Sequence, residues 1–185
     1  RMGRSQAACY RRLAPERGWY VSSIAKTVTP ALRFGFAIAP GDWTPALRRS
    51  AEHGYFGLGT PLTDLAGLLL PHPDLPGQSA AARAEVNRYI QTAANHLGGY
   101  DLNWRMDVPF LWLTLPGGWR AGAFCQAAAG LGVRIRAAEE FAARDDHTPH
   151  AVRLAINAGV SLTSFEAAIR RLRDLLDNPS ERIGV

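Results

Sequence analysis

One long helical segment divides this chain into two parts. Ser79 is a good N-cap residue, and Gly98-Gly99 is a typical end of a helix. Between them, apolar residues recur at helical spacing on one face: Ala82, Val86, Tyr89, Ile90, Ala93, Ala94 and Leu97. The pattern predicts a helix over residues 79–99, with strands and helices on both sides of it.

Before this helix, two short β-type runs at 19–23 and 34–39 surround a loop. Asp42 or Thr44 can cap a helix that runs through Ala51, and a short apolar helix is expected over 63–70. After the long helix, the sequence predicts a strand over 109–116, a helix over 121–129, strands over 133–136 and 152–157, and a last helix with the capping box Thr163–Glu166. Strands interleaved with helices indicate an α/β or α+β architecture.

Composition and charge argue against several classes of function. The formal net charge is +5, but the arginines are scattered, which disfavours a DNA-binding surface. The two cysteines make no disulfide framework, and Cys125 is interpreted as a packing residue. His147 and His150 lie in a loop without a completing acidic or cysteine cluster, so no metal site is expected. The sequence shows no signal peptide and no membrane-spanning run, and we expect a cytoplasmic protein.

Lys26 is the only lysine, and the other 20 basic residues are arginines. Arginine cannot replace lysine in imine chemistry, because its guanidinium stays protonated while a lysine amine can attack a carbonyl. The setting of Lys26, beside serines and an arginine, therefore indicates a Schiff base. The alternative is a surface lysine in an arginine-rich composition.

Ser23 and Arg33 flank this lysine in one strand–loop–strand segment. A phosphorylated carbonyl cofactor needs an amine, hydroxyl donors and a fixed cation for its phosphate, and the planar fork of arginine suits the last role. Alternatively, Ser23 makes a turn hydrogen bond and Arg33 is a solvated charge.

The segment Tyr20-Val21-Ser22-Ser23-Ile24-Ala25-Lys26-Thr27-Val28-Thr29-Pro30-Ala31-Leu32-Arg33-Phe34-Gly35-Phe36 resembles the pyridoxal-phosphate lysine segment of fold-type I aminotransferases. It is most similar to the aminotransferase-like domains of MocR-type GntR transcriptional regulators. Residues 112–116 resemble a strand near the start of the family's small domain, and residues 152–156 resemble its C-terminal strand.

The resemblance implies the C-terminal part of the aspartate aminotransferase-like α/β fold, with an α+β small domain. Residues 1–78 would be a remnant of the large cofactor-binding domain, 79–99 an interdomain helix and 100–185 the small domain. Lys26 would be the catalytic residue and would hold pyridoxal 5'-phosphate (PLP) as an internal aldimine. Ser23 and Arg33 would bind the cofactor phosphate, and Arg153 the carboxylate of an amino acid.

The position of Arg153 bears on this role, because Val152, Leu154 and Ile156 share one side of the strand and Arg153 faces the other. An arginine there either binds a carboxylate or lies on the solvent face. The family also implies a homodimer, in which Thr60 would approach the neighbouring subunit's cofactor.

The sequence departs from the family in two places. No aspartate precedes Lys26 to pair with the pyridine nitrogen, since the first is Asp42. Residues 138–141, Ala-Glu-Glu-Phe, replace the family's proline-glycine before a phenylalanine.

Three functions remain open from the sequence. They are a PLP-dependent aminotransferase acting on an amino acid and a 2-oxo acid, an effector-sensing domain of a MocR-type regulator whose DNA-binding domain lies outside this chain, and a fragment that only packs.

Overall fold

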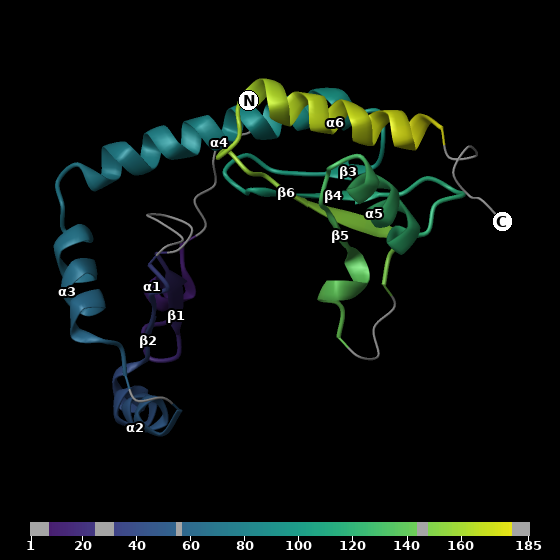
Figure 1. The fold of residues 1–185 in the computed structure, drawn as a ribbon. Coiled ribbons are helices and arrows are strands. Elements are labelled where there is room, and N and C mark those ends of the chain that lie inside the picture. Colours follow the sequence, from purple (N-terminus) through teal and green to yellow (C-terminus); the bar gives the residue numbers. More distant parts are fainter. Residues whose placement is uncertain (1–7, 25–31, 55–56, 144–147, 179–185) are drawn as a thin grey trace. The chain divides into compact units, whose positions relative to one another are not determined.

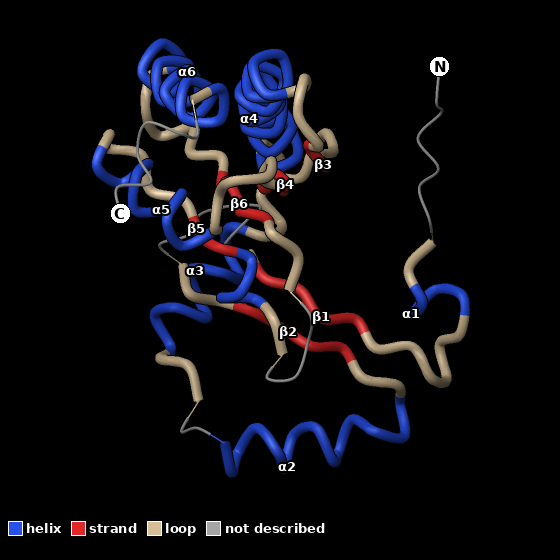
Figure 2. Tube along the Cα trace, turned by 90° about the vertical axis from the view of Figure 1, so that its right-hand side faces the viewer, coloured by secondary structure: helices blue, strands red, loops and turns tan. Residues whose placement is uncertain are grey.

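The computed structural model describes residues 8–24, 32–54, 57–143 and 148–178. The chain divides into two compact units, Arg1–Ser79 and Ala80–Val185. Figures 1 and 2 show the elements of both units. The three-part division expected from the sequence stays a prediction. In the described part of the chain, no helix is long and apolar enough to cross a membrane.

The first unit is built on a two-stranded antiparallel hairpin. Strand β1 pairs with β2 so that Tyr20 lies opposite Ile38 and Ser23 lies opposite Gly35. The elements of this unit are α1 (Tyr10–Leu13), β1 (Tyr20–Ser23), β2 (Gly35–Ile38), the 3-10 helix η1 (Gly41–Trp43), α2 (Thr44–Gly54) and α3 (Thr60–Leu69).

A small apolar cluster holds the hairpin against α3. Ile24, directly after β1, and Leu32, shortly before β2, are buried together with Ala66 of α3. Phe34, Leu62 and Leu69 pack against them. Both ends of segment 25–31 are therefore fixed by burial of an apolar residue, and the segment itself, with Lys26, lies outside the described residues.

The second unit is a four-stranded antiparallel sheet covered by helices. The strand order is β3-β4-β6-β5, with β3 at Leu102–Asn103, β4 at Phe110–Thr114, β5 at Arg136–Ala137 and β6 at Ala151–Ala155. The helices are α4 (Leu75–Leu97), which begins within the first unit, α5 (Ala121–Gly130), the 3-10 helix η2 (Ala138–Phe141) and α6 (Leu162–Asp177). Figures 1 and 2 both show α6 beside the C-terminal part of α4 over one face of the sheet.

Alternation along β4 and β6 gives this sheet two different faces. Leu111 and Leu113 of β4 and Val152 and Leu154 of β6 are buried in the core that the helices cover. Helices supply the rest of this core: Tyr89, Ala93, Leu97, Phe124, Ala128, Phe165, Ile169, Leu172, Leu175 and Leu176. The residues between the buried ones, Phe110, Trp112 and Arg153, are half-buried and belong to the other face, which we call the open face.

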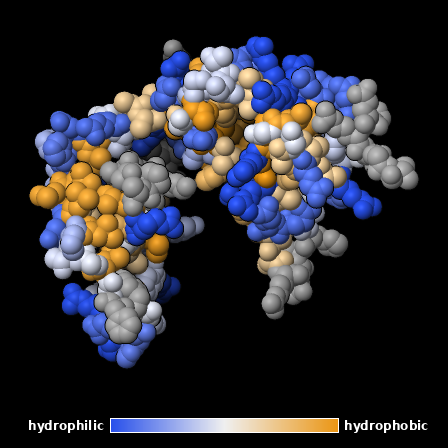
Figure 3. Space-filling model, in the orientation of Figure 1, coloured by the Kyte–Doolittle hydropathy of each residue, from blue (hydrophilic) through white to orange (hydrophobic). Residues whose placement is uncertain are grey.

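Figure 3 colours one face of the molecule by hydropathy, from hydrophilic in blue to hydrophobic in orange.

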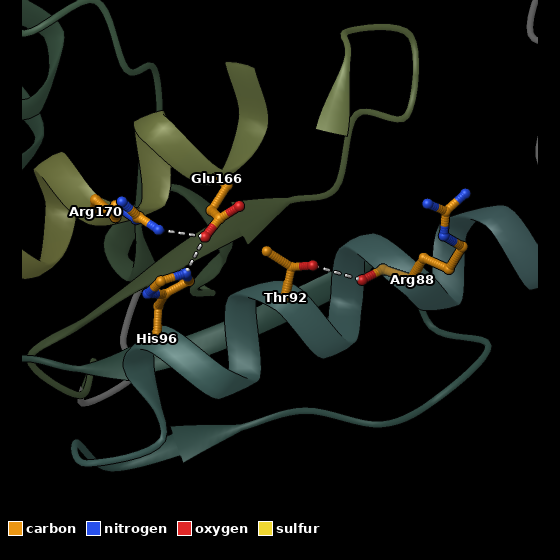
Figure 4. A network of polar contacts seen from close by, with 5 residues as sticks. All are labelled: Arg88, Thr92, His96, Glu166 and Arg170. Atoms are coloured by element: carbon orange, nitrogen blue, oxygen red, sulfur yellow. Dashed lines mark hydrogen bonds and ion pairs between the residues drawn. The ribbon is translucent and has the colours of Figure 1, made fainter. Parts of the chain in front are cut away.

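A polar contact connects α4 to α6 at the edge of the core (Figure 4). Nε2 of His96 lies 2.9 Å from Oε1 of Glu166, and Arg170 donates to the same oxygen at 2.7 Å. These two partners hold the pKa of the Glu166 carboxyl below its usual value. In the same view, Oγ1 of Thr92 donates to the backbone oxygen of Arg88 at 2.9 Å, a bond within α4.

The predicted start of the long helix is wrong. Ser79 lies inside α4, which begins at Leu75. Pro76 in the first turn favours this earlier start, because its fixed φ suits a helix and its missing N–H needs no partner there. Likewise α3 begins at Thr60 and not at residue 63, with Pro61 in its first turn.

Two further predictions, on the last helix and on β5, are wrong in detail. The N-cap of α6 is Ser161, whose Oγ accepts from the Ser164 backbone N–H at 3.2 Å, and Glu166 contacts His96 instead of completing a capping box with Thr163. The strand expected at 133–136 is only the pair Arg136–Ala137. Val133 donates its backbone N–H to the Ala128 oxygen in the turn that follows α5, so this N–H does not take part in strand pairing.

Candidate functional site

The hairpin of the first unit ends at the residues predicted to bind a cofactor phosphate. Oγ of Ser23 donates to the backbone oxygen of Phe34 at 3.2 Å, and the Ile24 N–H donates to the same oxygen at 3.1 Å. These bonds close the hairpin at the point where segment 25–31 leaves it. Ser23 thus makes the turn hydrogen bond that the sequence analysis gave as the alternative to phosphate binding. To donate to a phosphate, its hydroxyl would have to rotate.

Arg33 lies on the opposite side of the loop and is exposed. Among the described residues, its guanidinium makes no ion pair with a carboxylate. An exposed guanidinium without an acidic partner can bind a phosphate by donating two hydrogen bonds from its planar fork. The described residues at the ends of the loop therefore fit a phosphorylated cofactor, while the predicted roles of Ser23, Lys26 and Arg33 remain predictions.

Arg153 has an unusual environment on the open face of the second unit. Its guanidinium carbon lies 4.6 Å from the ring centroid of Phe110 and 3.9 Å from that of Phe141. Phe141 in turn packs against Trp112, with ring centroids 5.7 Å apart in an edge-to-face arrangement. Nε of Arg153 is buried and has no hydrogen-bond partner in the described structure.

This environment limits how Arg153 can bind a ligand. The two rings occupy positions over the guanidinium, where cation–π attraction holds it in place. The N–H groups of a guanidinium lie in its own plane, which is the geometry that binds a carboxylate through two bonds. Arg153 is therefore not simply a solvated arginine on the outer face of a strand, and its surroundings suit the predicted carboxylate role.

No protein-family model matches the chain. Solved aminotransferases share its fold. An aminotransferase from Mycobacterium tuberculosis aligns with 96% of this chain and 46% of its own length, with a TM-score of 0.80 and 18% identity. LysN, an α-aminoadipate aminotransferase from Thermus thermophilus, aligns with 91% of this chain and 44% of its own, with a TM-score of 0.77 and 20% identity. This chain has an aminotransferase fold.

The aminotransferase fold confirms the fold class that the sequence predicted, a portion of an α/β transferase fold. A curated relative is the uncharacterized HTH-type transcriptional regulator YdeF of Bacillus subtilis (strain 168), 26% identical over 165 residues. The match covers 89% of this chain and 36% of the regulator. The chain thus spans less than half the length of the proteins that it matches. The predicted resemblance to the aminotransferase-like domain of such regulators is confirmed by the shared fold and by this relative.

A second arginine lies next to Arg153 in this aminotransferase fold. Arg136 of β5 is the direct cross-strand partner of Arg153, so two like charges stand opposite each other. Such pairs destabilise a sheet unless a counter-charge is near. Glu140 supplies it: its Oε2 lies 2.5 Å from Nη1 of Arg136, and Arg136 and, more weakly, Arg153 lower the pKa of this carboxyl.

The aromatic neighbours of Arg153 could have been found in the sequence. Alternation along 110–114 places Phe110 and Trp112 on one face of β4, and pairing with the strand at 152–157 would bring them to Arg153. Phe141 gives no such signal, because it lies in the segment where the sequence departs from the family.

The remaining candidates add no group to the site. Thr60 is the exposed first residue of α3, and its predicted approach to another subunit stays a prediction. His147 lies outside the described residues, and no cluster of three metal-binding side chains occurs in the described part of the chain. Cys125 is half-buried against the core, as expected, and burial raises the pKa of its thiol.

Proposed function

We propose that this chain is a PLP-binding aminotransferase-like domain that holds the cofactor through Lys26 and recognises an amino acid by its carboxylate at Arg153. The observation that carries the proposal is the environment of Arg153. Its guanidinium is held by Phe110 and Phe141, its Nε has no acceptor, and no acidic residue forms an ion pair with it in the described structure. A substrate carboxylate could pair with this guanidinium from the two grooves that Arg153 lines.

Each proposed residue has a distinct task. Lys26 would hold the cofactor through its side-chain amine, and once an amino acid is bound the same amine would move a proton at its α-carbon. Arg33 and Ser23 would bind the phosphate from the two sides of the loop at one end of the hairpin, and Arg153 would orient the substrate through its carboxylate. When bound, the cofactor supplies the electron sink for transamination. The solved complex of LysN with N-(5'-phosphopyridoxyl)-L-leucine is consistent with such a ligand.

A second candidate function is an effector-sensing domain with little or no turnover. The observation that favours it is the 26% identity to an HTH-type regulator over 89% of this chain. In that case the same residues bind PLP and an amino acid, and the DNA-binding domain lies outside this chain. In both cases we propose a cytoplasmic homodimer.

The test is a visible-absorbance titration of the purified protein with PLP, followed by borohydride reduction and peptide mapping. We expect a yellow species and a reduced adduct on the peptide that contains Lys26. Because Lys26 is the only side-chain amine, Lys26→Arg should remove both signals and leave the circular dichroism spectrum unchanged. An adduct that persists in the variant, or no absorbance with a folded wild-type protein, would refute the proposal.

The two candidate functions separate at the next step. Appearance of a 2-oxo acid after addition of an amino acid and an acceptor indicates an aminotransferase. A spectral change on amino-acid addition without turnover indicates a sensor.

A further inference from the structure

We infer that the open face selects ligands that carry one carboxylate and a large apolar side chain, above all aromatic 2-oxo and amino acids, over dicarboxylic ones. The inference rests on the proposed function insofar as the carboxylate is bound by Arg153. Arg153 lines two grooves, one on the β4 side and one on the β5 side, and the residues around them differ in chemistry.

The groove on the β4 side is mainly aromatic. It encloses about 240 Å³, and Arg153 contributes to its wall together with Asn103, Trp104, Arg105, Val108, Phe110 and Trp112. This volume lies below the range of drug-sized pockets and suits the side chain of one amino acid. Three aromatic rings and one valine favour a flat apolar group, which gains both burial and ring–ring contact.

The loop wall of this groove is held in place before any ligand binds. Asp107 has a φ of 66°, the left-handed region that non-glycine residues rarely adopt. Asn87 of α4 stabilises it by two hydrogen bonds: Nδ2 of Asn87 donates to the Asp107 carboxylate at 2.9 Å, and the Asp107 N–H donates to Oδ1 of Asn87 at 2.8 Å. The turn that carries Trp104 and Val108 is therefore preorganised, which lowers the entropy cost of binding.

The groove on the β5 side has a volume of about 320 Å³ and is lined by Arg134, Arg136 and Glu140. Arg136 already has Glu140 as its partner at 2.5 Å, so a second ligand carboxylate would have to displace this internal anion. Arg134 and, in the first groove, Arg105 could also attract a second carboxylate, but both are exposed and water screens their charges. Glu140 is thus the proposed specificity residue against dicarboxylates.

The experiment is calorimetric titration of the protein without cofactor, using three probes: pyruvate, phenylpyruvate and 2-oxoglutarate. Each carries the 2-oxo carboxylate, and they differ only in the side chain. We expect phenylpyruvate to bind about tenfold more tightly than pyruvate, an amount that corresponds to burial of part of one aromatic ring. We expect 2-oxoglutarate to bind no more tightly than pyruvate.

Two variants assign the effects to residues. Trp104→Ala should weaken phenylpyruvate binding about fivefold and leave pyruvate unchanged. Glu140→Gln should free Arg136 and strengthen 2-oxoglutarate binding about fivefold relative to phenylpyruvate, whose binding should rise only slightly, because the interaction of Glu140 with Arg153 is weaker than that with Arg136. Glu139→Gln is the matched control, because Glu139 is the exposed neighbour and has no arginine ion pair in the described structure, so it should change neither.

The outcomes distinguish this inference from the proposed function. Equal binding of all three probes, tighter 2-oxoglutarate binding in the wild type, or equal effects of the two glutamate variants would overturn the selectivity alone. Failure of all three probes to bind would overturn the carboxylate role of Arg153 and the selectivity together. If the three probes bind in the expected order but PLP gives no absorbance, the selectivity of the grooves is supported and the proposal that the protein binds PLP is wrong.

Discussion

Replacing Arg153 by methionine should cost the protein little stability while it removes carboxylate binding. The guanidinium contacts two rings, at 4.6 Å from Phe110 and 3.9 Å from Phe141. Such contacts contribute about 0.5–1 kcal/mol each at partly exposed sites, so roughly 1–2 kcal/mol is lost with the charge. A methionine regains part of this through contacts of its sulfur with the same rings.

One unfavourable feature disappears in the same substitution. The buried Nε without an acceptor is removed, and leaving such a donor unsatisfied costs about 1–3 kcal/mol. Removal of the like charge opposite Arg136 changes little, because Glu140 already neutralises it. Gains and losses are of equal size, so we expect the free energy of unfolding of Arg153→Met to lie within about 1 kcal/mol of the wild-type value.

The assay is urea denaturation followed by circular dichroism, with calorimetric titration of phenylpyruvate on the same samples. Leu154→Ala is the matched control, because Leu154 is the next residue of β6 and is 3% exposed on the core face. It should lose about 2–5 kcal/mol. If Arg153→Met lost more than about 2 kcal/mol, or kept its affinity for the ligand, Arg153 would be a structural residue and the reasoning would be wrong.

Three further predictions concern the second unit. Ser161→Ala should lower the free energy of unfolding by about 1 kcal/mol, because it removes the N-cap acceptor of α6; an unchanged urea midpoint would contradict the assignment. Glu166 has a lowered pKa in the folded protein, so its stabilising effect exists above its unfolded pKa and is lost as the pH falls through the folded value. The stability difference between wild type and Glu166→Gln should therefore shrink as the pH is lowered through that range, and a difference that stays constant in acid would contradict it. Burial and the hydrogen bond to Asp177 raise the pKa of Tyr100 to about 12. The difference between the ultraviolet titrations of wild type and Tyr100→Phe should therefore have its midpoint near that pH. A midpoint near 10, the usual value for tyrosine, would show that the contact is absent in solution.

The sequence predicted the order of the main elements because each carries its own local signal. The run that is closed by Pro116-Gly117-Gly118 indicated the strand at 109–116, and helical spacing indicated the long helix. The position of Arg153 on the face opposite Val152 and Leu154 is confirmed. Helix starts were less predictable, since Ser79 competes with Pro76 and a longer helix forms more hydrogen bonds.

Other features depend on contacts between distant residues. The two-residue strands β3 and β5 are too short for a periodic pattern and exist through pairing with β4 and β6. For the site, the sequence singled out Arg153 but not Phe141 or Glu140, because their positions follow from the folding of η2 against the open face. Lys26, the residue with the strongest signal in the sequence, lies outside the described residues and stays a prediction.

The double hydrogen bond between Asn87 and Asp107 has a consequence for how this protein can change over time. A non-glycine residue at φ 66° is uncommon, and although aspartate adopts this region more readily than most residues, the Asn87 side chain stabilises it here. Loss of the Asn87 amide alone leaves a strained turn, whereas glycine at position 107 adopts the same backbone without help. The two positions are therefore expected to covary among relatives, with replacement of Asn87 more frequent where position 107 is glycine.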